Sequence, residues 1–344
     1  MERLLTQSEK PLRIGILGAA AIAREFVRGV RGSSKLTVET VASRDPLRAQ
    51  SFANELGLRR HTLSYEDLLA DPDIDAIYNP LPNSLHAHWS VLAMRAGKHV
   101  LCEKPLAANA DEARLMVQAA KENGVHLVEA YPYRSQPLTI KMLGMLAAGE
   151  IGSVEMIHAD FGFPMSNESN IRLDPALKGG SLWDAGCYPV SLARMVAGMR
   201  PIRAQAVATW TSTGVDKTVA ATLEFPNGLM AQVSCSFNTA VHRHATIVGT
   251  AGVIRTDYPN NPSMESPATL QIKRGARGTR YETVEAPAMN GFLAEAESFC
   301  DLVRHGPAFW NGVTNEESID ILLTLDAIHE SAQRRAPVDI ASEE

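Results

Sequence analysis

The sequence predicts a two-domain α/β protein, in which a parallel sheet with helices on both faces precedes an α+β domain with a large, mostly antiparallel open sheet. The first observation is the length of 344 residues, which exceeds the usual size of a single hydrophobic core. The second is that short apolar segments alternate with helical segments in the N-terminal part, as in covered parallel sheets. The third is that later segments alternate in polarity, as half-covered strands do. We therefore expect an N-terminal arm over residues 1–11, a first domain over 12–131 and a second domain over 132–344.

The first domain contains five expected apolar strands with helical segments between them. The helix after the second strand ends at Gly57, and Ser64 precedes a short helix with the sequence YEDLLA. Asn109 and Glu112 have the spacing of a capping box that opens a helix ended by Gly124. The expected strands cover residues 12–17, 36–43, 73–80, 98–102 and 125–130.

The second domain contains two neighbouring strands, at 219–225 and 229–237, in which alternate residues are apolar. Asn227-Gly228 between them is a strong hairpin signal. Such a sheet is covered on one face only, so we expect a homodimer that forms through the C-terminal sheet, and a tetramer is equally compatible. A late helix begins at a capping box made by Thr314 and Glu317. Further strands are expected at 202–212, 242–249, 252–257 and 268–273.

The charge balance argues against several partner classes. The net charge is −6, from 33 Lys and Arg against 39 Asp and Glu, which disfavours general binding to nucleic acid or to an anionic membrane. No apolar window is long enough to cross a membrane. Four widely spaced cysteines indicate a reducing compartment, and the first residues do not resemble a signal peptide. We therefore expect a cytoplasmic protein with a small-molecule substrate.

The segment GILGAAAIA joins the first strand to the first helix. A dinucleotide-binding turn needs small residues, so that the backbone approaches the pyrophosphate, and a free helix N-terminus. Gly18 begins the glycine fingerprint, and Ala20 and Ala23 stand at its next two glycine positions. An ordinary strand-to-helix turn is the alternative, but the repeated strand–helix order favours a Rossmann dinucleotide-binding domain. Its expected phosphate contacts are Gly18, Ala20, Ala21 and Ile22.

The end of the second strand predicts which dinucleotide binds. An acidic residue there would hold the ribose hydroxyls of NAD. This chain instead has Ser43 and Arg44, with Arg48 one helical turn further. A hydroxyl and guanidinium groups suit a 2′-phosphate, so we expect NADP. The alternative is that Arg44 is an ordinary solvated arginine.

The sequence then resembles the Gfo/Idh/MocA family of oxidoreductases over nearly its whole length. The similar segments are GILGAAAIA, VASRD, YEDLLADPDIDAIYNPLPNSLH, AGKHVLCEKPLA, EAYPYR and GGSLWDAGCYPV. The combination of EKP after the fourth strand with a downstream D-x-G-x-(His/Tyr) segment is specific. Many members have His at the last position, whereas this chain has Tyr188. Tyrosine there resembles the branch with glucose–fructose oxidoreductase, D-xylose dehydrogenase, dihydrodiol dehydrogenase and ketosugar reductases.

The resemblance implies roles for three residues. Lys104 would reach the nicotinamide and the reacting hydroxyl, and its bond to Pro105 is often cis in such proteins. Tyr188 would carry the proton. Free tyrosine is a poor base, so we expect the nearby ammonium and the positive nicotinamide to lower its pKa. Asp184 would orient the sugar hydroxyls or the lysine; a helix cap is the alternative.

The resemblance also suggests weaker candidates around the cofactor, and no metal-ligand cluster is evident. Glu103 would lie beside the cofactor, and Arg172 could touch cofactor or sugar. The loop at Pro80, Asn83 and His86 would pass under the nicotinamide ribose. The segment with Tyr131 and Arg134 would border the site. For these two segments and Arg172, a structural role is an equal alternative. The full set of expected cofactor contacts is Gly18, Ala20, Ala21, Ile22, Ser43, Arg44, Arg48, Pro80, Asn83, His86, Glu103, Lys104, Arg134 and Arg172.

The resulting hypothesis is an NADP-dependent oxidoreductase that transfers hydride between the nicotinamide and an aldose or other pyranose carbon. One alternative is an aldose–aldose oxidoreductase that retains NADP(H) between turnovers. Another is a ketosugar or dihydrodiol reductase. A non-catalytic NADP sensor is disfavoured, because a sensor does not need Lys104, Asp184 and Tyr188 together.

Overall fold

The computed structural model describes residues 10–167 and 169–340, so most of the expected arm over residues 1–11 lies outside the described residues. The first sheet is parallel, with the order β3-β2-β1-β4-β5-β6. This confirms the expected α/β architecture. Its strands are β1 Leu12–Leu17, β2 Leu36–Ala42, β3 Arg60–Thr62, β4 Ala76–Asn79, β5 His99–Glu103 and β6 Leu127–Ala130.

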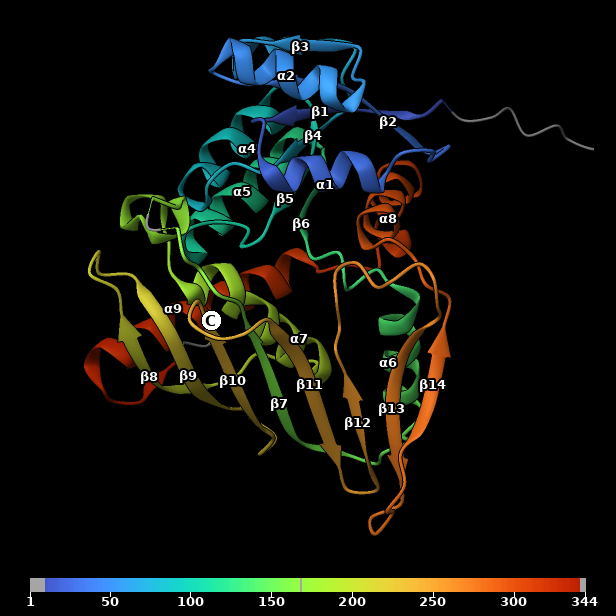
Figure 1. Cartoon of the computed structure of the whole chain (residues 1–344), viewed down its shortest axis with the longest axis vertical. Coiled ribbons are helices and arrows are strands. Elements are labelled where there is room, and N and C mark those ends of the chain that lie inside the picture. Colours follow the sequence, from blue (N-terminus) through green and yellow to red (C-terminus); the bar gives the residue numbers. More distant parts are fainter. Residues whose placement is uncertain (1–9, 168, 341–344) are drawn as a thin grey trace, which may run out of the picture.

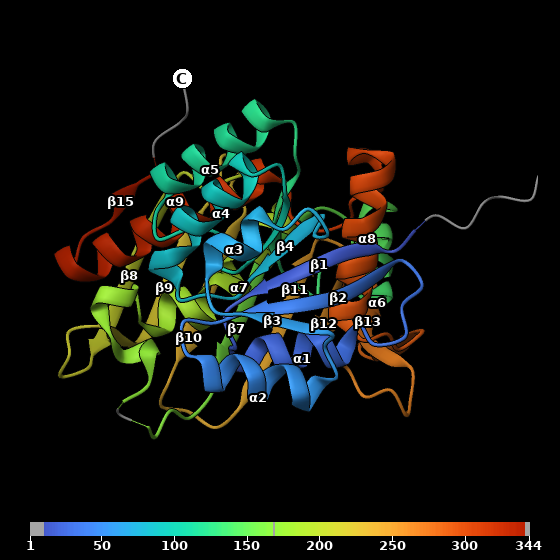
Figure 2. The ribbon, with the colours of Figure 1, turned by 90° about the horizontal axis from the view of Figure 1, so that it is seen from above.

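Helices cover both faces of this sheet, with α1 and α2 on one side and α4 and α5 on the other (Figure 2). Strand β3 was not expected, because it has only three residues and two of them are exposed. The helices and short turns of this part are α1 Ala21–Gly29, α2 Pro46–Leu56, α3 Tyr65–Ala70, the 3₁₀ turn η1 Asn83–Leu85, α4 His86–Arg95 and α5 Ala110–Asn123.

The two expected capping boxes differ. Thr314 and Glu317 form the reciprocal pair in full. Asn109 accepts from the Glu112 N–H at 2.9 Å, but the Glu112 carboxylate accepts from the N–H of Ala108 at 3.1 Å instead. The box at α5 is therefore only half formed.

The second sheet has the order β14-β13-β12-β11-β7-β10-β9-β8-β15. Only β7 and β10 pair in parallel in the described sheet, which confirms a mostly antiparallel domain. Strands β7, β14 and β15 were not among the expected ones. The strands are β7 Val154–Gly162, β8 Arg203–Trp210, β9 Asp216–Glu224, β10 Met230–Ser236, β11 His242–Gly249, β12 Gly252–Thr256, β13 Ala268–Arg274, β14 Glu282–Ala286 and β15 Val338–Asp339.

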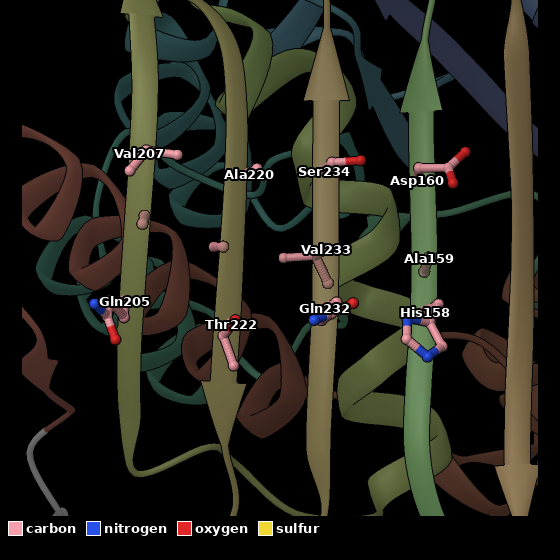
Figure 3. Close-up of a pocket in the computed structure, with 12 residues that line it drawn as sticks. His158, Ala159, Asp160, Gln205, Val207, Ala220, Thr222, Gln232, Val233 and Ser234 are labelled. Carbon is pink, nitrogen blue, oxygen red and sulfur yellow. The ribbon is translucent and has the colours of Figure 1, made fainter.

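Helices α6, α7 and α9 lie on one face of this sheet and leave the other face open (Figure 1). On the open face, a shallow hollow of about 510 Å³ runs across β8, β9, β10 and β7 (Figure 3). The helical segments of this part are α6 Pro137–Ala147, η2 Ile171–Leu173, η3 Pro175–Leu177, the π-helical turn η4 Leu182–Gly186, α7 Cys187–Ala197, α8 Gly291–His305, η5 Pro307–Phe309 and α9 Asn315–Arg334.

Helix α8 returns to the first sheet, although it lies late in the sequence. Phe292 and Phe299 of α8 are buried in the core formed around α1 and β1. Phe26 of α1 stacks on Tyr78 at 4.0 Å between ring centroids and meets Phe292 edge-on at 6.4 Å. This aromatic packing ties the chain after the second sheet to the first sheet.

Candidate active site

Lys104 follows β5 at the carboxyl edge of the parallel sheet, where open α/β sheets bind ligands. The Lys104-Pro105 peptide is cis, as expected from the resemblance. The Lys104 ammonium crosses to the second domain, where it donates to the backbone oxygen of Asp184 at 2.7 Å and to its carboxylate at 3.2 Å. The strand end therefore places a largely buried cation between the domains.

Asp184 and Tyr188 lie four residues apart on a continuous helical segment, in the π turn η4 and the first turn of α7. This spacing places both side chains on the same face, and single π turns are frequent at functional sites. The Lys104 ammonium lies 5.0 Å from the centroid of the Tyr188 ring. Arg172 donates from Nε to the Asp184 carboxylate at 2.7 Å. Lys104, Asp184, Tyr188 and Arg172 thus form one cluster.

The charges of Lys104 and Asp184 support each other. Burial opposes the charged form of Lys104, but the carboxylate of Asp184 and other nearby acidic groups hold its pKa above the ordinary value. Burial also opposes ionisation of Asp184, but Lys104 and Arg172 hold its pKa below the ordinary value. Lysine and aspartate are therefore both charged at neutral pH.

Tyr188 is 5% exposed, and its pKa lies above the ordinary value of tyrosine. Burial raises the pKa of Tyr188 to about 12, although Lys104 and Arg243 lower it in part. Lys104 lowers this pKa as expected, but burial outweighs its effect, and the lowering expected from the nicotinamide stays a prediction. The hydroxyl accepts a hydrogen bond from Nδ2 of Asn260 at 2.9 Å, so its proton stays available to another acceptor.

The turn between β1 and α1 fits a dinucleotide phosphate. Gly18 has φ of +91°, and a Cβ there would lie 3.0 Å from Leu81 Cδ2, so the turn requires glycine. Ala20 precedes α1 without a side-chain cap, and no acidic residue lies in the first turn of the helix. Ala21 is exposed and Ala20 and Ile22 are partly so. The N-terminal amides of α1 are therefore open to an anion.

The residues after β2 fit a 2′-phosphate better than free ribose hydroxyls. Asp45 caps α2, because its carboxylate accepts from the N–H groups of Leu47 and Arg48 at 3.0 and 3.2 Å. Arg44 and Arg48 are exposed, while Ser43 is buried. The Asp45 carboxylate is thus hydrogen-bonded to the start of α2, and the guanidinium groups of Arg44 and Arg48 are open to solvent.

Two residues that were expected to contact the cofactor form hydrogen bonds within the protein instead. The His86 ring is 1% exposed, and its nitrogens contact the backbone oxygens of Pro105 and Leu81 at 2.8 and 2.6 Å, so it does not present a polar atom to a cofactor. Arg134 is buried and donates to Glu317 at 2.8 Å. Both residues therefore serve structural contacts.

The remaining candidate residues lie around the cluster, and each makes a hydrogen bond to another part of the protein. Glu103 is buried and accepts from the Tyr78 hydroxyl at 2.6 Å. Asn83 donates to the backbone oxygen of Lys178 at 3.0 Å, which joins the loop after the buried Pro80 to the second domain. Tyr131 donates to the Cys187 oxygen at 3.4 Å and meets the Tyr188 ring edge-on. These residues shape the site without exposing a charged group to it.

His242 and His244 lie two residues apart on β11. The structure supplies Asp160, whose Oδ1 lies 3.6 Å from His242 Nε2 and 3.1 Å from His244 Nδ1. Within residues 10–167 and 169–340, however, no group of three or more His, Cys, Asp or Glu side chains is arranged to hold a metal ion.

Two polar residues of the site were missed by the sequence analysis. Arg243 lies with Ala245 and Ile247 on the buried face of β11, and a charged residue in line with an apolar face was the available signal. Asn260 lies in a loop, and nothing in its sequence context indicated that it reaches Tyr188.

A parallel dinucleotide-type sheet with a Lys–Asp–Tyr cluster at its carboxyl edge defines the class of nicotinamide-dependent oxidoreductases. Comparison with protein families matches residues 12–131 to the oxidoreductase family with an NAD-binding Rossmann fold. Residues 139–255 match the GFO/IDH/MocA C-terminal domain. The chain belongs to the Gfo/Idh/MocA family and is an oxidoreductase.

Several relatives are named for reactions on sugars. The chain is 38% identical to D-xylose 1-dehydrogenase (NADP(+)) 2 from Haloferax volcanii, over 96% of this chain and 100% of that protein. It is 33% identical to dTDP-3,4-didehydro-2,6-dideoxy-alpha-D-glucose 3-reductase from Streptomyces violaceoruber, over 87% of each chain. A crystal structure of a 3-ketoreductase from Actinomadura kijaniata with NADP and TDP-benzene aligns with a TM-score of 0.85 and 29% identity, covering 93% of this chain and 98% of that one.

Glu129, at the end of β6, supports the turn that follows Lys104. Its Oε1 accepts from the N–H of Leu106 at 2.9 Å, and its buried Oε2 has no hydrogen-bond partner among the described residues. Burial raises the pKa of Glu129 to about 7, and nearby donors offset only part of this effect. The carboxyl group therefore begins to ionise near neutral pH inside the protein.

Replacing Glu129 with Gln removes this ionisation. The pKa of Glu129 is higher in the folded chain than in the unfolded chain, so its stabilising neutral form is complete below about pH 4.5 and lost as the pH rises through about 7. We expect the unfolding free energy of the wild type to fall relative to Glu129→Gln by ~1–3 kcal/mol between about pH 5 and pH 8. Denaturant unfolding of both proteins measures this, with the exposed Glu265→Gln as control. Parallel pH curves for wild type and Glu129→Gln would contradict it.

Proposed function

We propose that the protein is an NADP-dependent oxidoreductase that transfers a hydride between the nicotinamide and a sugar carbon, with Tyr188 as acid and base and Lys104 assisting. The observation that carries the proposal is the cluster of Lys104, Asp184 and Tyr188 at the carboxyl edge of the first sheet. Bound NADP(H) would supply the hydride acceptor or donor. The side chains of the cluster supply the proton and the charge that this reaction requires.

In the direction of oxidation, hydride leaves the carbinol carbon while the hydroxyl proton passes to the deprotonated Tyr188. In reduction, Tyr188 returns the proton to the carbonyl oxygen as the carbon receives hydride. The Lys104 ammonium, kept charged by Asp184, attracts the reacting oxygen and stabilises its developing negative charge. Proton and charge are thus handled by separate groups of the chain.

An aldose is our first substrate class, supported by the NADP-dependent D-xylose dehydrogenase among the relatives. A specific observation favours reduction of a ketosugar as the second candidate. With its pKa at about 12, Tyr188 is neutral at pH 7 and ready to donate a proton to a carbonyl oxygen. The nucleotide-sugar reductases among the relatives support the same direction.

The Lys104→Ala and Tyr188→Phe variants test the proposal. We expect each to lower kcat with NADP and D-xylose, or with a ketosugar and NADPH, by at least ~100-fold, because charge stabilisation or proton transfer is lost. NADP affinity, measured by fluorescence titration, should change little. The exposed Lys121→Ala and the distant Tyr281→Phe serve as matched controls. Wild-type turnover in either site variant would refute its assigned role.

An absorbance assay distinguishes an enzyme that retains NADP between turnovers from one that exchanges it. Purified protein is first mixed with aldoses without added cofactor, and absorbance of reduced nicotinamide is followed. A rise stoichiometric with protein would support a retained NADP and an aldose–aldose reaction. Steady turnover only after NADP is added would support an ordinary dehydrogenase.

Arg44→Ala tests the choice of NADP. Removing a charge-assisted bond to the 2′-phosphate should weaken NADP binding about tenfold and leave NAD binding within about twofold. The exposed Arg95→Ala, on α4, is the matched control. Dissociation constants from fluorescence titration measure both cofactors. Equal changes for NADP and NAD would exclude a contact of Arg44 with the 2′-phosphate.

We also propose a homodimer that forms through the open face of the second sheet. Val207 on β8 and Met230 on β10 are 67% and 44% exposed on this face, and Val207 lines the hollow of about 510 Å³ (Figure 3). A broad unpaired sheet face with exposed apolar side chains is typical of a self-association surface.

Replacing Val207 with Asp in a Met230→Asp background tests the dimer. Four added charges across a two-fold contact should shift the mass in light scattering from dimer to monomer at micromolar concentration. Leu115→Asp, an exposed leucine on α5, should leave the mass unchanged. A wild-type protein that is already monomeric under these conditions would rule the dimer out.

The compartment is part of the same proposal. Cys102, Cys187, Cys235 and Cys300 are buried and unpaired, which fits a protein of the reducing cytoplasm. In the described part of the chain, no helix has the length and apolar character needed to cross a membrane.

A further inference from the structure

Arg243 has an unusual environment beside Tyr188. Its guanidinium carbon lies 4.1 Å from the centroid of the Tyr188 ring and 4.5 Å from that of Tyr258. The rings of Phe161 and Tyr133 lie at 5.0 and 5.3 Å. In the described part of the chain, Nε and Nη2 of Arg243 are buried and have no hydrogen-bond partner. Burying a guanidinium that contacts mainly aromatic ring faces costs folding free energy. Its position against Tyr188 suggests that this cost serves the function of the site.

A hydrogen-bonded chain joins the same guanidinium to the Tyr188 hydroxyl. Nη1 of Arg243 donates to Oδ1 of Asn260 at 3.2 Å, and Nδ2 of Asn260 donates to the Tyr188 oxygen at 2.9 Å. Both bonds run in one direction, from the cation to the phenol oxygen. A donor that points at this oxygen stabilises the phenolate more than the phenol, and the cation polarises the amide between them.

The loop that carries Asn260 is fixed from several sides. Tyr258 has φ of +32°, a strained conformation for a bulky residue, and its hydroxyl donates to the backbone oxygen of Asp160 at 3.0 Å. Nε2 of Gln136 donates to the backbone oxygens of Pro259 and Asn260. Gly291 leaves room for the loop, since a Cβ there would clash with the Asn260 oxygen. The surrounding structure therefore holds the amide in place against Tyr188.

We propose that Arg243 and Asn260 are positioning residues for Tyr188, which orient the phenol and favour its deprotonated form while a proton passes to or from the substrate. This inference rests on the proposed function, because it assumes that Tyr188 exchanges the proton. Lys104 is engaged by Asp184 and must also attract the reacting oxygen. Arg243 and Asn260 add stabilisation of the phenolate without touching the substrate oxygen.

Other groups around Tyr188 act on its proton as well. Burial opposes the phenolate most strongly, Lys104 and Arg243 favour it, and Glu103 and Cys187 oppose it. These groups stay unchanged in the variants below, apart from Arg243 itself. The titratable and charged groups that face Tyr188 are Tyr78 from β4, Glu103 and Lys104 from β5 and its following turn, Tyr131 and Tyr133 after β6, Arg172 from η2, Cys187 from α7 and Arg243 from β11. Tyr258, after β12, contacts Arg243.

The test is the pH profile of kcat/KM for the holoenzyme in sugar oxidation. With the oxidised cofactor bound, the positive nicotinamide favours the phenolate, and this rate rises with pH until Tyr188 is deprotonated. Weaker stabilisation of the phenolate therefore moves the rising limb to higher pH. We expect Arg243→Met, whose flexible side chain fills the space between the rings, to move the limb up by about one pH unit. Below the limb, oxidation should slow about tenfold at a fixed pH. The KM for NADP should not change.

Asn260→Leu should move the limb in the same direction. Because both residues act partly through one chain, the shift in the double variant should be smaller than the sum of the single shifts. Arg255→Met is the matched control, since Arg255 also lies over an aromatic ring, that of Tyr281 at 4.4 Å, on the neighbouring strand β12. Its limb should coincide with that of the wild type.

The outcomes distinguish this inference from the proposed function. An inactive Tyr188→Phe together with an unmoved limb in Arg243→Met would overturn the inference alone, including the case in which the rate falls equally on the limb and on the plateau above it. Additive shifts in the double variant would overturn the shared chain. A fully active Tyr188→Phe would overturn the proposed function, and the inference with it.

Discussion

The ion pair between Lys104 and Asp184 is the contact on which the site depends. It joins the carboxyl edge of the parallel sheet to the π turn that begins α7, and so fixes the two domains at the place where Tyr188 is presented. Both side chains are largely buried, and removing Asp184 would leave the Lys104 ammonium without its carboxylate partner. Arg172 adds a second cation at 2.7 Å on the same carboxylate. One acidic group between two basic groups leaves a local excess of positive charge, which suits an oxygen that becomes negative during hydride transfer.

The pKa of Tyr188 is set by two opposing effects, the nearby positive charge and the apolar surroundings of its ring. The rings of Tyr131, Tyr133 and Phe161 pack around it, and burial outweighs the two cations in setting its pKa. In the proposed function, the neutral phenol beside a permanent cation gives its proton in reduction, and the phenolate accepts one in oxidation, so one arrangement of side chains serves both directions of the reaction. The positive nicotinamide of an oxidised cofactor would favour the phenolate further, in the direction where a base is required.

Local sequence patterns predicted much of the fold and half of the site. The apolar strands, Gly57, Gly124 and the Thr314 box depend on nearby residues, and the structure confirms them. The return of α8 to the first sheet depends on Phe292 meeting Phe26, a contact between distant segments that no local pattern encodes. The same holds for His86: its motif suggested a cofactor contact, but backbone oxygens of Pro105 and Leu81 occupy both ring nitrogens. Arg243 and Asn260 were missed because their roles arise only when β11 and its neighbouring loop meet α7.

The two domains contribute to the site in different ways. In the proposed function, the first domain offers mainly backbone to the cofactor, at the Gly18 turn and the uncapped start of α1. Small residues suffice there, so the motif is visible in the sequence. The second domain offers side chains from β7, β11 and the loop after β12, where Phe161, Phe163 and Arg243 lie on the covered side of the sheet. Strand sequences report which residues are buried but not what they face. In the proposed function, the identity of the sugar therefore depends on these strands, and variation there would change the substrate while the cofactor turn and the Lys104–Asp184 pair stay the same.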